Sequence, residues 1–339
     1  MMRVFSTFLL IIFMTNKSYA KIRDIISFEF GEFLRFAIEL SEKSDISFSA
    51  DSNKIKINFK KDLGKGTKRA KDYIILWEGK NFTINFRKEF SYVRYFIIPM
   101  PYKIIVDVGF GKKDVDEIIL DREDEEKKKN KVIVIDAGHG GRDPGTMWEG
   151  IKEKDINLKL VKKIYEEIIR NSVFRAILTR KEDKFISLDE RSAIANATEC
   201  DIFVSIHVNS SEKRNSPSGF EIFYFSQKFS NYALRIAQKE NGVRFDQGSK
   251  ILFDIYSEFR ENESYRLAKK ISERIKSLKK VRTIEGAPLY VLAGTFCPAV
   301  LIEIGFIDNP EDFHSLRSDT FLKRLAKEIF LGIKDFLEG

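Results

Sequence analysis

Apolar and polar residues alternate with a period of two over residues 21–110. Short runs rich in aromatic and β-branched residues, such as FLRFAIEL (33–40), NFTINFR (81–87) and YKIIVDVGF (102–110), are separated by polar and glycine-containing turns. This alternation is typical of half-buried strands. The segment is therefore predicted to form a small all-β domain, either an antiparallel sandwich or a small barrel.

The pattern changes after residue 131, where unbroken apolar runs alternate with segments of helical periodicity. Such alternation indicates right-handed crossovers and a mostly parallel sheet with helices on both faces. The fold class predicted for residues 131–339 is therefore α/β, preceded by the smaller all-β, sandwich-like domain. The predicted strands are 132–136, 174–180, 202–207, 219–225 and 299–305, and the predicted helices are 155–170, 188–196 and 319–337.

Length and charge agree with a division into two domains. The chain has 339 residues, of which 43% are hydrophobic, and a chain of this length commonly forms more than one core. Residues 111–130 are dense in charge and have no sustained apolar face. They are interpreted as a solvated linker between the two domains.

The first twenty residues have the pattern of an export signal. Arg3 precedes an apolar run from Val4 to Met14, and Ser18-Tyr19-Ala20 supplies the small residues of a cleavage site. The run is shorter than the roughly 20 residues that span a bilayer, and no later stretch is long enough. The mature protein is therefore expected outside the cytoplasm, in the periplasm or alternatively secreted or associated with the cell wall.

The charge of the β-domain bears on its partner. Residues 21–110 carry 17 Lys and Arg against 12 Asp and Glu, a net charge of +5. A basic exported domain suggests an anionic surface such as cell wall or lipid headgroups, and an ordinary lysine-rich solvated surface is the alternative. Nucleic acid is excluded as a partner by export and by the lack of a basic motif interleaved with aromatic residues.

Two cysteines, Cys200 and Cys297, each precede an apolar run. An exported protein could pair them, but two cysteines form neither a disulfide framework nor a CxxC metal site. Free cysteine is among the residue types most often buried. The two are therefore expected to be unpaired thiols, with a disulfide as the alternative.

Four residues with chemically useful side chains are expected at one edge of the predicted sheet. His139 follows strand 132–136 in the glycine turn AGHGG, and His207 ends strand 202–207. Glu153 immediately precedes a helix, and Glu303 interrupts an apolar strand near its carboxyl end. The carboxyl ends of parallel strands meet at the same edge, where ligands bind in such sheets. A buried carboxylate costs several kcal/mol unless it is paired or bound to a metal.

Two histidines and one glutamate are a known ligand set of catalytic Zn²⁺, which keeps a fourth position for water, and a further glutamate can act as general base. Taken singly, each residue also has a structural explanation as a turn cap, a strand-end hydrogen-bond partner or a favourable charge at a helix start. Because two of only three histidines gather with two glutamates, a metal site is favoured. The third, His314, is assigned to an exposed helical surface.

Several motifs of residues 131–338 resemble, in order and spacing, the zinc-dependent N-acetylmuramoyl-L-alanine amidases of bacterial cell-wall turnover. The motifs include VIVIDAGHGGRDPG (132–145), GIKEKDINL (150–158), SIHVNS (205–210) and PAVLIEIGFIDNPED (298–312). The resemblance implies that the chain binds one zinc ion and hydrolyses the amide bond between N-acetylmuramic acid and L-alanine in peptidoglycan. The residue roles that it implies are His139, Glu153 and His207 as metal ligands, Glu303 as the catalytic carboxylate, and Arg282 and Asn209 in substrate binding.

Two further segments are similar to parts of these enzymes. Residues 227–263 form an insertion, and related envelope amidases carry one here that covers the zinc cleft until an activator protein displaces it. Extra scaffold helix is the alternative. The centre of the insertion, SKILFDIYSEF (249–259), is expected to direct Asp254 or Glu258 toward the metal. FLRFAIEL and YKIIVDV are loosely similar to AMIN domains, which target such amidases to peptidoglycan.

Two other functions are compatible with the same residues. A zinc carboxypeptidase acting on wall peptides would use the same ligand set but would recognise a free carboxylate. A non-catalytic wall-binding protein would be favoured by a missing ligand, and none is missing. Amide hydrolysis in the wall is the interpretation that the motifs favour.

Overall fold

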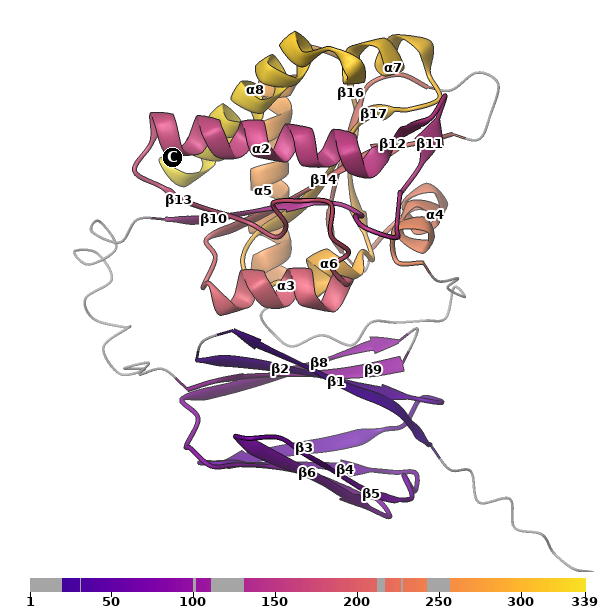
Figure 1. Ribbon diagram of the computed structural model, residues 1–339, viewed down its shortest axis with the longest axis vertical. Helices are drawn as coiled ribbons and strands as arrows, with labels where there is room; N and C mark the ends of the chain where they lie inside the picture. The colour runs from indigo at the N-terminus through magenta and orange to yellow at the C-terminus, as the bar shows by residue number, and fades with distance from the viewer. Residues whose placement is uncertain are drawn as a thin grey trace, which may run out of the picture. The chain divides into compact units, whose positions relative to one another are not determined.

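The computed structural model describes residues 20–30, 32–99, 102–110, 131–211, 217–226, 228–242 and 257–339 (Figure 1). The predicted linker 111–130 and the predicted export signal, apart from Ala20, lie outside these residues. The chain divides into two compact units. Leu40–Glu89 and the described residues before Asp24 form the first unit, and Asp24–Glu39 with the described part of Phe90–Gly339 forms the second.

The first unit is an antiparallel five-stranded sheet in the order β3-β4-β7-β6-β5. Buried and exposed residues alternate along β4 and β7, as expected of strands with one face on a core. The alternating pattern of the sequence therefore predicted these strands. Their bounds are β3 Ile46–Asp51, β4 Lys54–Phe59, β5 Lys65–Arg69, β6 Tyr73–Glu78 and β7 Asn81–Phe86.

The second unit begins with a four-stranded sheet in the order β1-β2-β9-β8. Its strands are β1 Ile22–Phe30, β2 Phe33–Leu40, β8 Tyr92–Pro99 and β9 Tyr102–Gly109. Strand β9 pairs antiparallel with both β2 and β8. The prediction that residues 21–110 are all-β is confirmed, and the two sheets of this segment belong to different compact units.

The rest of the second unit is built on a six-stranded sheet in the order β13-β10-β14-β17-β15-β16. Strand β10 is parallel to β13 and β14, and β14 is parallel to β17. Strand β15 is antiparallel to β17 and parallel to β16, so the sheet is mixed with a single antiparallel pair. The strands are β10 Val132–Ala137, β13 Arg175–Leu178, β14 Ile202–Asn209, β15 Phe220–Phe225, β16 Val281–Ala287 and β17 Ala299–Phe306.

Helices cover both faces of this sheet, as predicted, and Figure 1 shows α2 and α8 on one side with α3 and α6 on the other. One core cluster joins the sheet to α2 Glu153–Asn171, α5 Ser257–Ile275, α7 Pro310–Arg317 and α8 Asp319–Leu337. A second cluster joins it to α3 Leu188–Ala197, α4 Asn231–Glu240 and α6 Tyr290–Ala293. The central strands β10, β14 and β17 are buried along their whole length, which explains their unbroken apolar runs. Among the described residues, no helix is apolar over a length that could cross a membrane.

Cys200 and Cys297 form a disulfide with their Cα atoms 5.8 Å apart, so the prediction of unpaired thiols is wrong. Cys200 lies just before β14 and Cys297 just before β17, and these parallel strands are neighbours in the sheet. The residues that precede these two strands therefore lie close together at the same end of the sheet. The sequence separation of 97 between the cysteines hid this proximity from sequence reasoning.

Candidate metal centre

The first histidine of the site lies in the turn that follows β10. His139 has a positive φ of 58°, a conformation that is costly for a side chain with a Cβ and is kept only where neighbours impose it. The Nη2 of Arg191 donates to the His139 carbonyl at 2.7 Å. The His139 Nδ1 lies 2.8 Å from Oδ2 of Asp143, a contact in which Nδ1–H donates. The Nε2 atom is thereby the ring nitrogen available to bind a metal ion.

Glu153 is the first residue of α2 and is fully buried. Its Oε2 accepts hydrogen bonds from the backbone N–H and the hydroxyl of Thr146, and its Oε1 accepts one from the Val208 N–H at 2.8 Å. A short hairpin, β11 Met147–Trp148 and β12 Ile151–Lys152, connects Thr146 to this glutamate. These bonds hold both carboxylate oxygens, and Oε1 is also directed at the two histidines.

Two glycines allow the groups to approach. A Cβ on Gly138 would collide with the ring of His207, and a Cβ on Gly145 would lie 2.6 Å from Oε2 of Glu153. Gly145 also has a φ of +65°, which favours glycine. His207 itself lies near the carboxyl end of β14, with its ring centroid 4.9 Å from that of His139. The predicted convergence of His139, Glu153 and His207 is therefore seen in the structure.

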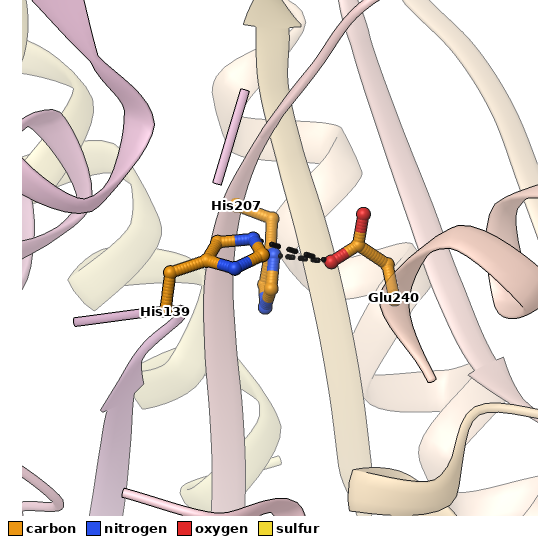
Figure 2. Close-up of side chains that lie close together, drawn as sticks. All are labelled: His139, His207 and Glu240. Atoms are coloured by element: carbon orange, nitrogen blue, oxygen red, sulfur yellow. Dashed lines mark ion pairs between the residues drawn. The ribbon is translucent and has the colours of Figure 1, made fainter. Parts of the chain in front are cut away.

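A fourth ligand-type group comes from α4, which lies in the predicted insertion. Figure 2 shows Glu240, the last residue of α4, directed at both histidines. Its Oε2 lies 2.9 Å from Nδ1 of His207 and 3.4 Å from Nε2 of His139. The Oε1 of Glu153 lies 3.2 Å from the same two nitrogen atoms. Sequence reasoning did not identify Glu240, which sits in the insertion but outside the segment expected to reach the metal.

These four atoms fit a tetrahedral zinc ion. Zinc binds nitrogen and oxygen ligands at about 2.0–2.1 Å, so the ligand atoms of a tetrahedral site are about 3.3 Å apart. The four nitrogen–oxygen separations, 2.9 to 3.4 Å, match this edge length. The buried ligand atoms of His139, His207 and Glu240 also have no hydrogen-bond partner among the described residues. Buried polar atoms are rarely left so, and a metal ion would satisfy them.

Without a metal, the negative charges of the site keep both histidines protonated. Burial alone lowers the pKa of His139, but the charge of Glu153 and the hydrogen bond to Asp143 raise it to about 12. Burial likewise lowers the pKa of His207, and Glu240 and Glu153 raise it to about 9. Burial raises the pKa of Glu153, but the two histidines lower it well below its usual range. The carboxylates are therefore ionised beside protonated imidazoles.

Glu303 lies beside this cluster without a partner. Strand β17 places it opposite His207 of β14. The side chain is fully buried, and neither carboxylate oxygen has a hydrogen-bond partner in the described structure. Burial, followed by the charge of Glu240, raises its pKa to about 8. Glu303 is thus a carboxylate with a raised pKa next to the predicted metal ligands, as a general base or acid requires.

Asn209 and Arg282, expected to bind substrate, both contact Glu221. The Nδ2 of Asn209 donates to Glu221 at 3.0 Å, and the Nε of Arg282 lies 3.2 Å from its other oxygen. Glu221 of β15 is buried and pairs with Glu303 of β17. Glu303 is therefore not the only buried glutamate in the central sheet. A single glutamate interrupts the apolar run GFEIFYF (219–225), and this interruption could have identified Glu221 from the sequence.

Helix α4 is anchored at both ends over this cluster. The hydroxyl of Tyr232 donates to Glu221 at 2.6 Å. At the other end, Asn241 Oδ1 accepts from the Tyr290 N–H at 2.9 Å. Residues 249–256, which include Asp254 and most of the segment that was expected to reach the metal, lie outside the described residues, as does the side chain of Glu258.

Comparison with known proteins identifies the family. The family Amidase_3, described as N-acetylmuramoyl-L-alanine amidase, matches residues 133–335. The chain belongs to this family. The predicted ligands His139, Glu153 and His207, together with Glu303, all fall within the matched residues.

Individual proteins align with about three fifths of the chain. The endolysin of Bacillus phage SPP1 is 36% identical over 209 residues, 61% of this chain and 66% of the endolysin. The N-acetylmuramoyl-L-alanine amidase AmiC of Escherichia coli is 31% identical over 60% of this chain, and the match spans about half, 52%, of AmiC. The solved structure of the amidase AmiC2 of Nostoc punctiforme is 30% identical over 62% of this chain and 98% of AmiC2, with a TM-score of 0.47.

Proposed function

We propose that the chain is a zinc-dependent hydrolase that cuts the amide bond between N-acetylmuramic acid and L-alanine in peptidoglycan. One observation carries the proposal: buried ligand atoms of His139, Glu153 and His207 converge at zinc-ligand separations beside the unpartnered carboxylate of Glu303. Membership of the amidase family supplies the bond that is cut. The site chemistry alone would accept any amide that reached it.

The proposed roles follow from the geometry. Bound zinc would lower the pKa of water toward about 7 and polarise the scissile carbonyl. Glu303 would take the proton of the attacking water and return it to the departing amine of L-alanine, so that the carboxylate ends each cycle unprotonated. Asn209 and Arg282 would orient the substrate on the side of Glu221. The Asp143 carboxylate would keep Nε2 of His139 available to the metal.

We further propose that the structure represents an inhibited state. Catalytic zinc keeps its fourth position for water, and Glu240 lies where a fourth ligand would bind. An activator protein would act by favouring a state in which α4 has left the cleft. Loss of the Glu240 charge would also remove one of the causes that raise the pKa of Glu303, which would favour its ionised, proton-accepting form.

Peptidoglycan is the proposed partner and zinc the proposed metal, with the mature chain exported to the periplasm. The net charge of +5 on residues 21–110 supports contact with an anionic wall polymer. The disulfide supports an oxidising compartment. The AMIN-like role of residues 21–110 in wall targeting belongs to the same proposal.

The test combines metal analysis with product analysis. The mature chain and its Glu240→Ala variant are loaded with zinc, assayed for one bound ion, and incubated with purified peptidoglycan. The variant is included because an inhibited parent would hide the activity. Intact stem peptides with a free amino-terminal L-alanine are expected. Single released residues would indicate a carboxypeptidase, and zinc-loaded protein that gives no product in either form would indicate a wall-binding protein.

A further inference from the structure

The second compact unit contains a buried ion pair far from the metal ligands in sequence. Arg35 of β2 and Asp107 of β9 are both fully buried. The Arg35 Nε and Nη2 atoms each donate to one Asp107 oxygen at 2.6 Å. This two-point geometry is the strong, oriented form of an arginine–carboxylate contact.

The remaining donors of Arg35 are directed at the α/β part of the unit. Its Nη1 donates to the hydroxyl of Ser192 at 2.6 Å and to the carbonyl of Asp189 at 3.1 Å. Its Nη2 also donates to the carbonyl of Gly294 at 3.0 Å. All five guanidinium donors are thereby used, so the side chain has one orientation. Asn196 Nδ2 joins the same network through Asp107 and Gly294.

Three of these contacts, with Ser192, Asp189 and Gly294, connect Arg35 to elements of the proposed metal site. Ser192 and Asp189 belong to α3, and the neighbouring Arg191 donates from that helix to Asp136 and to the carbonyls of Ala137 and His139 at 2.6 to 2.7 Å. Helix α3 therefore lies between Arg35 and the turn that presents His139. The Gly294 contact holds the start of the segment that runs into β17, which carries Glu303.

We propose that Arg35, oriented by Asp107, is a positioning residue for the metal site, acting through α3 on His139 and through the segment after α6 on β17. The four-stranded sheet β1-β2-β9-β8 accordingly helps to hold the metal ligands and β17 in position. The apolar contacts agree with this role, since Ala37, Phe96 and Ile105 of the sheet pack in one core cluster with α3, α4 and α6. Because it concerns a metal ligand, the inference rests on the proposed zinc site.

The test uses the full mature chain and two variants. Arg35→Lys keeps the positive charge beside Asp107, but one ammonium group has three donors and cannot reproduce the planar five-donor arrangement. Ser192→Ala removes a single acceptor on α3 and leaves the ion pair intact. The readouts are zinc affinity, measured by competition with a chelator, and the visible absorption spectrum of the Co²⁺-substituted site.

Arg35→Lys is expected to lower zinc affinity about tenfold or more, in the range seen when groups that orient metal ligands are changed. Ser192→Ala is expected to lower it by a smaller factor, and both should alter the Co²⁺ spectrum. Thr198→Ala is the matched control, because Thr198 also bonds to the carbonyl four residues earlier in α3 but does not contact Arg35. Arg274→Lys controls for an ion pair between α5 and α8. Both controls should keep the parent's affinity and spectrum even if they melt earlier.

Folded Arg35→Lys and Ser192→Ala proteins that keep the parent's zinc affinity and Co²⁺ spectrum would overturn the inference. If Arg35→Lys does not fold, Ser192→Ala decides, since it removes one hydroxyl and no charge. A parent that binds no zinc contradicts the proposed metal site itself. A parent that binds zinc with unaffected variants contradicts only the role of Arg35.

Discussion

His207 and Glu303 occupy paired positions in the neighbouring parallel strands β14 and β17. Side chains at paired positions lie on the same face of a sheet. The proposed metal ligand and the proposed proton carrier are therefore fixed relative to each other by backbone hydrogen bonds between two strands that are buried along their whole length. A change at Glu303 should accordingly leave the ligand geometry in place.

Glu303→Gln should retain zinc and fold while lowering hydrolysis by about 10²- to 10⁴-fold, the usual contribution of general acid–base catalysis. The amide keeps the shape of the side chain but cannot accept the proton. Turnover is measured on peptidoglycan in the parent and in a Glu240→Ala background, with the exposed Glu311→Gln as control. Near-parental turnover by the zinc-loaded variant would show that Glu303 does not carry the proton.

Glu240→Ala should raise hydrolysis in the absence of any activator, because it removes the carboxylate that lies at the proposed fourth ligand position. The expected increase is about 5- to 150-fold, by analogy with the usual range of allosteric coupling between two binding sites. Glu263→Ala serves as control, since this glutamate of the same insertion pairs with Arg266 on α5. If the zinc-loaded Glu240→Ala protein is no more active than the parent, α4 is scaffold and activation occurs elsewhere.

Zinc binding should release protons, and zinc affinity should fall as pH falls. The pKa of His139 is raised to about 12 and that of His207 to about 9, so both imidazoles hold a proton at neutral pH without metal. Zinc binds neutral imidazole, and protons therefore compete with it. Calorimetric titration at pH 7 in two buffers of different ionisation enthalpy measures the release. Equal apparent enthalpies in both buffers would contradict the assigned ligands.

Removal of the Cys200–Cys297 disulfide should lower the free energy of unfolding of the second unit by about 4 to 5 kcal/mol, the chain-entropy value for a loop of about 100 residues. The double variant Cys200→Ala/Cys297→Ala is compared with the parent by denaturant unfolding. Reductant should lower the midpoint of the parent and leave that of the variant unchanged. Identical midpoints for oxidised parent and variant would show that the bond adds no stability.

The sequence predicted the parts of the site that are local to strand ends. Apolar runs identified β10, β14 and β17, and the rule that their carboxyl ends share an edge brought His139, His207 and Glu303 together. Glu240 was missed because the residues of α4 show only an amphipathic pattern. Such a pattern predicts a helix with one buried face, but it does not predict which groups the last side chain contacts. The disulfide was missed for a related reason: cysteine pairing depends on which strands are neighbours, and spacing along the chain does not reveal it.

The ligand-type groups come from four separate segments: the turn after β10, the start of α2, strand β14 and the end of α4. Strand β14 is flanked in the sheet by β10 and β17, and β17 lies close to the carboxyl terminus. When the chain has been synthesised as far as Glu240, strand β14, which carries His207, has its neighbour β10 but still lacks its other neighbour, β17. A metal ion held by these groups would therefore bind late in folding, after β17 has joined the sheet, and metal content would then report on completed folding.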